Sequence, residues 1–187
     1  MICTKTYSAP PLDRREILRY AGVRGDAPEI EALLDECLAE AEGKLTYKVC
    51  CDTFPVSFFD PLGSEGLKKH LEGCREAVIF AATVGIGIDR LIARYASISP
   101  TKSLLFQAIG AERIEALCDE FNSEFGGSRF SPGYGDLSLE FQKEIFKVLD
   151  CPKRIGLTLN ESMLMSPSKS VTAIIGAKNE DKRIFEK

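Results

Sequence analysis

Histidine is almost absent from this chain, which has one among 187 residues, His70, and tryptophan is absent altogether. A single histidine excludes zinc sites of the HExxH type and nucleophile triads built on histidine. The phosphate-binding GxxxxGK[ST] motif is missing, and "TVGIGID" (83–89) lacks the third glycine of a dinucleotide-binding loop because Arg90 stands there. We therefore expect Gly85 and Gly87 to form a tight strand-to-helix turn, and His70, on a lysine-rich helix, to be solvated.

The chain also lacks an excess of basic residues and a long apolar run. Lys+Arg number 24 against 28 Asp+Glu, a net charge of −4, so neither nucleic acid nor an anionic membrane is an expected partner. The longest apolar run, at 77–88, is too short and too rich in glycine to span a bilayer. The N-terminus has no apolar stretch of signal-peptide length, so we expect a cytoplasmic protein.

The seven cysteines show no CxxC spacing. An odd number of scattered thiols favours a reducing compartment over a disulfide framework. Cys37 is expected in the core. Cys50 and Cys51 are adjacent on a predicted strand and should point to opposite faces, reduced and free of metal. Adjacent cysteines bind zinc in homocysteine-activating methyltransferases, but that alternative requires a third thiolate and a large barrel.

Hydrophobic periodicity predicts one mixed domain over residues 1–187, with clustered helices and more strands late than early in the chain. In the helix at 26–44, Asp26 and Glu29 are expected to form a capping box, and Ser64, Ser99 and Ser138 are expected to cap later helices. The predicted helices are 13–21, 26–44, 64–73, 88–97, 99–125 and 138–150, and the predicted strands are 45–54, 76–84, 154–159 and 170–178. The charged residues 178–187 are expected to fray.

The stretch "RFSPGYGD" (129–136) is the most unusual in the chain. Pro132 lacks an amide hydrogen, and Gly133 and Gly135 permit backbone angles that other residues avoid. The stretch is predicted to be an irregular loop at a concave surface, with Arg129 and Tyr134 available to a ligand. A plain connecting turn is the alternative.

This stretch resembles the Arg-x-x-Pro-Gly-Tyr loop of the S-adenosylmethionine-binding activation domain of cobalamin-dependent methionine synthase. "NESMLMSPSKSVTAIIGAKN" (160–179) resembles the second signature of that family, and "AERIEALCDEF" lies where the family has a helix rich in alanine and glutamate. The strand signals and the resemblance together predict an α+β domain with a twisted, mainly antiparallel sheet flanked by clustered helices. Its N-terminal helical part extends to about residue 75, and its motif-bearing part covers about 75–180.

The resemblance implies roles for individual residues. Arg129 would pair with the carboxylate of S-adenosylmethionine, Ser131 would contact the ligand through its main chain, and Tyr134 would lie beside the methyl-donor and corrin side. Pro132 and Gly133 would expose the main chain and fix its turn. The family's acid for the ligand's amino group lies in an Asp-Trp-Thr-Pro context, for which "CDTFP" offers Asp52; a helix acid, Glu112 or Glu115, could match a second family contact.

The resemblance also implies a function, the reactivation of a corrinoid methyltransferase. The protein would bind S-adenosylmethionine and support reductive methylation of cob(II)alamin carried by a partner protein, such as a truncated methionine synthase. A flavodoxin-type protein would supply the electron, and the present chain would act as a stand-alone accessory without a catalytic residue or metal of its own. The alternative is a non-catalytic docking or regulatory partner of a corrinoid protein.

Overall fold

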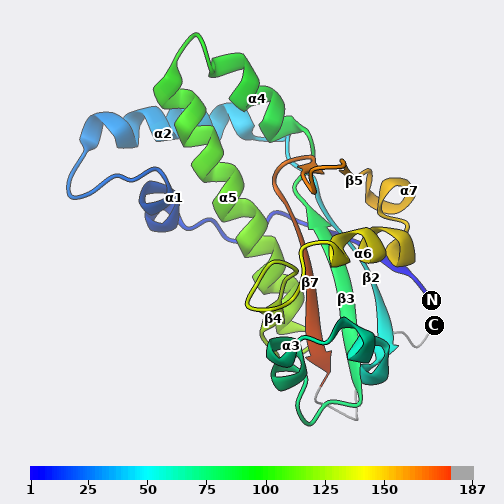
Figure 1. Cartoon of the computed structure of the whole chain (residues 1–187). Helices are drawn as coiled ribbons and strands as arrows, with labels where there is room; N and C mark the ends of the chain where they lie inside the picture. Colours follow the sequence, from blue (N-terminus) through cyan, green and yellow to red (C-terminus); the bar gives the residue numbers. More distant parts are fainter. Residues whose placement is uncertain (178–187) are drawn as a thin grey trace.

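The computed structural model describes residues 1–177. Its centre is a five-stranded sheet whose neighbouring strands are all antiparallel, in the order β1-β2-β3-β7-β4 (Figure 1). The strands are β1 (Cys3–Tyr7), β2 (Tyr47–Pro55), β3 (Glu76–Thr83), β4 (Arg129–Phe130) and β7 (Ser170–Ala177), and β5 (Thr158–Leu159) pairs separately with β6 (Met165–Ser166). The predicted α+β class with an antiparallel sheet is confirmed. The charged segment expected to fray, 178–187, lies outside the described residues.

Helices cover both faces of this sheet. The long helix α5 crosses one face and reaches from the sheet to a cluster made by α1, α2 and α4 (Figure 1). The opposite face carries α3, α6, α7 and a short 3-10 helix. The helices are α1 (Arg14–Tyr20), α2 (Pro28–Ala41), the 3-10 helix η1 (Val56–Leu62), α3 (Glu65–His70), α4 (Gly87–Tyr95), α5 (Pro100–Ser123), α6 (Phe141–Leu149) and α7 (Cys151–Ile155).

The central strands are buried on both faces, which explains the continuous apolar sequence of β3. Val78 and Phe80 point into the core under α5, whereas Ala77 and Ile79 point into the core under α6. Such two-sided burial replaces the polar–apolar alternation of a half-exposed strand. Cys51 and Cys50 on β2 likewise lie in different cores, as predicted, and Cys37 is buried.

Three helices have side-chain N-caps: those at Ser64 and Ser99 were predicted, and the one at Asp13 was not. The Asp13 carboxylate accepts from the amides of Arg15 and Glu16 at 2.9 and 3.1 Å, and Ser64 Oγ accepts from the amide of Leu67 at 3.0 Å. Ser99 Oγ accepts from the amide of Lys102 at 3.5 Å. These contacts satisfy amide groups that have no partner within the helix, so each helix begins close to its predicted start.

Other local predictions were wrong. Asp26 does not cap α2, which begins after Ala27 without a side-chain cap and has Pro28 in its first turn. A proline there has the φ of a helix already and needs no amide partner. Ser138 lies three residues before α6, for which Glu140 is the N-cap residue. In the strand expected at 154–159, Arg154 and Ile155 belong to α7 and Gly156 is its C-cap, and only Thr158–Leu159 is extended.

The N-terminal part supplies more than helices. Strand β1, which was not predicted, pairs with β2, so residues 1–75 contribute two strands of the sheet. The Gly85–Gly87 turn is as tight as predicted, because a Cβ on Gly87 would lie 1.9 Å from the carbonyl oxygen of Lys44. None of the helices within residues 1–177 has the length and apolar character needed to cross a membrane.

Candidate functional site

The unusual loop begins as part of the sheet. Arg129 and Phe130 form β4 and pair with Ile175 and Ile174 of β7. The stretch 129–136 is therefore not wholly irregular, contrary to the prediction. Because β4 has only two residues, it fixes the backbone of Arg129 at the sheet edge and releases the chain immediately afterwards.

The rest of the loop is a compact turn. The Gly133 amide donates to the Leu137 carbonyl at 2.8 Å, and the Tyr134 amide donates to the Ser131 carbonyl at 3.1 Å. Gly133 has φ +90°, a left-handed conformation that L residues with a side chain rarely adopt. These bonds hold the turn while leaving Tyr134 with 69% of its surface exposed.

Asp136 fixes this turn to α3. Its carboxylate accepts from Ser64 Oγ and from the amides of Glu65 and Gly66, at 2.7 and 3.1 Å for the two amides. The hydrogen bond from Ser64, followed by those from the backbone, lowers the pKa of Asp136 below its ordinary value.

Phe130 packs against His70 with ring centroids 5.3 Å apart, so His70 is partly buried rather than solvated as predicted.

Arg129 is held by carboxylates from α5. Its Nη1 donates to Asp119 at 2.6 Å, and its Nη2 donates to Glu115. These two acids lie one helical turn apart on α5. With the Asn122 amide oriented so that its nitrogen donates to the Cys118 carbonyl, its oxygen accepts from Arg129 Nη1 at 2.9 Å. Burial disfavours the guanidinium charge, but the hydrogen bond to Asp119 and the nearby negative charges raise the pKa of Arg129. The cation is therefore permanent.

A groove of about 710 Å³ opens beside this cluster, within the size range of ligand sites. We call it the Arg129 groove. Its lining comes from the end of α5, the following turn, the β4 loop and β7: Glu115, Asp119, Asn122, Ser123, Gly126, Gly127, Ser128, Arg129, Phe130, Ser131, Tyr134 and Val171. The loop thus lies at a concave surface, as predicted.

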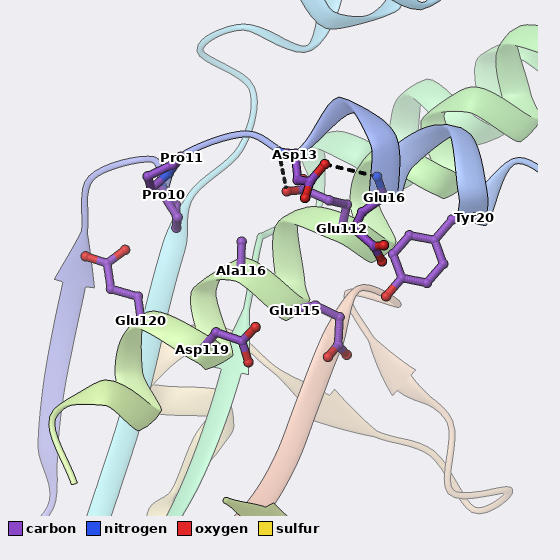
Figure 2. A pocket seen from close by; sticks show the side chains of 10 residues that line it. All are labelled: Pro10, Pro11, Asp13, Glu16, Tyr20, Glu112, Glu115, Ala116, Asp119 and Glu120. Atoms are coloured by element: carbon purple, nitrogen blue, oxygen red, sulfur yellow. Dashed lines mark hydrogen bonds between the residues drawn. The ribbon is translucent and has the colours of Figure 1, made fainter. Parts of the chain in front are cut away.

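A second hollow, of about 530 Å³, shares Glu115 and Asp119 with the Arg129 groove. Figure 2 shows carboxylates from α5 and from the start of α1 facing into it, with Tyr20 at one side. We call it the acidic hollow. Its lining is Pro10, Pro11, Asp13, Glu16, Tyr20, Glu112, Glu115, Ala116, Asp119 and Glu120.

One buried ion pair shapes the acidic hollow. Arg113 donates to the carbonyls of Pro10 and Pro11 at 2.6 and 2.8 Å, and Glu112 accepts from the Asp13 amide at 3.0 Å while pairing with Arg113. The pair therefore ties the N-terminal segment to α5. Sequence reasoning missed this role of Arg113, because nothing in the sequence indicates that its charge is buried with an adjacent glutamate.

The structure brings together some of the predicted site residues and separates others. The Arg129 groove is lined by Arg129, Ser131, Tyr134 and Glu115, whereas Pro132 and Gly133 lie in the same loop but are not among its lining residues. Asp52 lines neither hollow; it lies on β2, where its carboxylate is 2.9 Å from the N-terminal ammonium.

The cysteines form no metal centre in the part of the chain that the structure describes. Cys50 Sγ lies 3.9 Å from Cys151 Sγ, and both thiols are buried between β2 and α7. Burial raises the pKa of Cys51 to about 12, so this thiol stays protonated at neutral pH.

Comparison with known proteins gives the chain a family context. Residues 108–186 match the family described as the activation domain of vitamin B12-dependent methionine synthase. The methionine synthase of Mycobacterium tuberculosis is 32% identical over 96 residues, a match that covers 49% of this chain and 8% of that protein.

The fold has a counterpart among solved structures. A crystal structure of the MetH reactivation domain bound to AdoHcy superimposes with a TM-score of 0.65, covering 97% of this chain and 80% of that one, at 16% identity. The resemblance inferred from the sequence is thus confirmed. The family match contains the end of α5, the β4 loop and β7, which are the elements that form the Arg129 groove.

Proposed function

We propose that the Arg129 groove binds S-adenosylmethionine and that this chain supports reductive methylation of cob(II)alamin held by a partner methyltransferase of the methionine synthase type. The observation that carries the proposal is the placement of Arg129 in a groove, beside an exposed Tyr134, within the segment that matches the activation-domain family. The AdoHcy bound to the MetH reactivation domain supports a ligand of the same chemical class here.

The residues of the groove suit the methionyl end of such a ligand. Arg129 would bind the carboxylate with two parallel hydrogen bonds, for which a guanidinium is better suited than an ammonium. Glu115 would accept from the ligand's amino group, because it lines the groove, whereas Asp52 lies elsewhere. Ser131 would offer its main chain, since the turn at Pro132 and Gly133 leaves the backbone near the groove.

The chemistry itself would be supplied by the methyl donor and the corrinoid. Together they would supply one-electron reduction of cob(II)alamin, with a flavodoxin-type protein as the donor, and transfer of the methyl group of S-adenosylmethionine to cobalt, with S-adenosylhomocysteine as the other product. The chain would bind and orient the donor and exclude water, a contribution that needs no general acid or nucleophile. Tyr134, exposed at the rim, would face the reacting end.

A second candidate is a docking or regulatory partner that binds a corrinoid protein without using S-adenosylmethionine. The observation that favours it is the ion pairing of Arg129, which two carboxylates of the same chain already satisfy. A guanidinium engaged in this way could have a purely structural role.

Equilibrium titration distinguishes the two candidates. Purified protein is titrated calorimetrically with S-adenosylmethionine and S-adenosylhomocysteine, alone and with a corrinoid-loaded methionine synthase that lacks its own activation domain. Saturable binding of both ligands supports the proposed function. Binding of the corrinoid protein without either small ligand would favour the docking role instead.

A further inference from the structure

The terminal nitrogens of Arg129 are both engaged by acids of the same chain. Nη1 donates to Asp119 and Nη2 donates to Glu115, so each side of the guanidinium fork meets a different carboxylate. Nη1 carries two N–H groups, and the oxygens of Asp119 and Asn122 both accept from Nη1. A ligand carboxylate that binds end-on through Nη1 and Nη2 must therefore take the place of an acceptor at Nη1.

The two acids are not equally easy to displace. The Asp119 side chain is 72% exposed, against 43% for Glu115. Within residues 1–177, the only hydrogen bond of the Asp119 carboxylate is the one to Arg129. The Asp119 carboxylate can therefore rotate toward the solvent and be rehydrated at once, whereas the less exposed Glu115 loses less by staying in place.

We infer that Asp119 is an internal competitor for Arg129, which a carboxylate-bearing ligand displaces when it enters the groove. The inference rests on the proposed function and adds a residue that determines ligand affinity and selectivity. Glu115 stays in place and remains available to the ligand's amino group, while Asp119 is released to solvent.

The competition has a modest, measurable size. Exposed ion pairs contribute up to about 1 kcal/mol, which corresponds to about fivefold in a binding constant. The cost of breaking the Arg129–Asp119 ion pair applies only to ligands that bind the guanidinium. An adenosine thioether without a carboxylate, such as 5′-methylthioadenosine, leaves the Arg129–Asp119 pair intact and avoids it.

The test compares two ligands with two single-charge variants of the full chain. In Asp119→Asn, S-adenosylhomocysteine should bind about threefold to fivefold more tightly by calorimetry, and 5′-methylthioadenosine should bind as it does to the wild type. Glu120→Gln is the matched control, because it removes one negative charge from the next residue of α5 without touching Arg129. Its affinities for both ligands should equal those of the wild type, and circular dichroism verifies that both variants are folded.

Several results would overturn the inference. Unchanged or weaker binding of S-adenosylhomocysteine to Asp119→Asn would mean that Asp119 is not a competitor, and weaker binding would make it a ligand contact. Equal tightening in Glu120→Gln would reduce the effect to general electrostatics. If wild type and Asp119→Asn both bind no ligand, the proposed function fails and this inference fails with it; binding by Asp119→Asn alone supports the inference.

Discussion

Replacing Arg129 by alanine should weaken the binding of S-adenosylmethionine without unfolding the protein. A charge-assisted, two-point contact to a carboxylate contributes about 2–3 kcal/mol. The alanine variant, however, has no Arg129–Asp119 ion pair that the ligand must break, and this offsets the loss of binding free energy by up to about 1 kcal/mol. The expected net loss is about 1–3 kcal/mol, or roughly fivefold to 150-fold in affinity.

The same substitution should have a smaller effect on stability. The Arg129 side chain is 20% exposed, but the side chains of Asp119 and Glu115 are 72% and 43% exposed, and water weakens both ion pairs. Removing the cation also leaves two carboxylates close together. We expect the free energy of unfolding to fall by about 1–2 kcal/mol.

The assay combines calorimetric titration with urea denaturation. Arg129→Lys should recover only part of the affinity, because an ammonium keeps the charge but loses the fork. 5′-Methylthioadenosine, which lacks a carboxylate, should bind wild type and Arg129→Ala almost equally. If Arg129→Ala binds S-adenosylmethionine as tightly as the wild type does, the reasoning about this groove is refuted.

Three further predictions concern the loop, the core and the thiols. The wild type should have a larger free energy of unfolding than Asp136→Asn near neutral pH, because folding lowers the pKa of the Asp136 carboxylate. This difference should be lost as pH falls below about 4, and a difference independent of pH in urea titrations would contradict that. Gly87→Ala should lower the free energy of unfolding by about 2–3 kcal/mol, since its Cβ would meet the Lys44 carbonyl; an unchanged urea midpoint would argue against this contact. In the folded protein Cys3 and Cys74 should react first with a thiol reagent, as the other five cysteines are buried, and mass spectrometry of the labelled peptides would expose any other order.

Much of the fold follows from local patterns in the sequence. The capped helices at Asp13, Ser64 and Ser99, the buried run of β3 and the glycine turn after it are each specified by residues within a few positions. Such signals act through the backbone and its nearest neighbours, so no tertiary information is needed to interpret them.

The errors arose where distant contacts decide the structure. Strand β1 depends on pairing with β2, more than forty residues later in the chain, and its short polar–apolar alternation is weak evidence by itself. At the start of the strand expected at 154–159, helix α7 continues to Ile155 because Asp150 adopts a left-handed conformation and Pro152 starts a new helical turn.

The candidate site divides in the same way. Arg129 and Tyr134 could be identified from the motif alone, because glycine and proline around polar residues are rare outside ligand loops and turns. That Asp119 and Glu115 engage Arg129 could not be foreseen, since the contact joins a helix face to a sheet edge. The remote position of Asp52 likewise depends on the strand order of the sheet.

The most direct test of the account follows the methyl group. S-adenosylmethionine labelled with a trideuterated methyl is mixed with reductant, a flavodoxin-type electron donor and a methionine synthase that lacks its activation domain and carries cob(II)alamin. Mass spectrometry then measures trideuterated methylcobalamin with and without this protein. The account predicts that label appears on cobalt only when the protein is present and falls sharply with Arg129→Ala at subsaturating S-adenosylmethionine; equal labelling without the protein, or none with it, would contradict the proposed function.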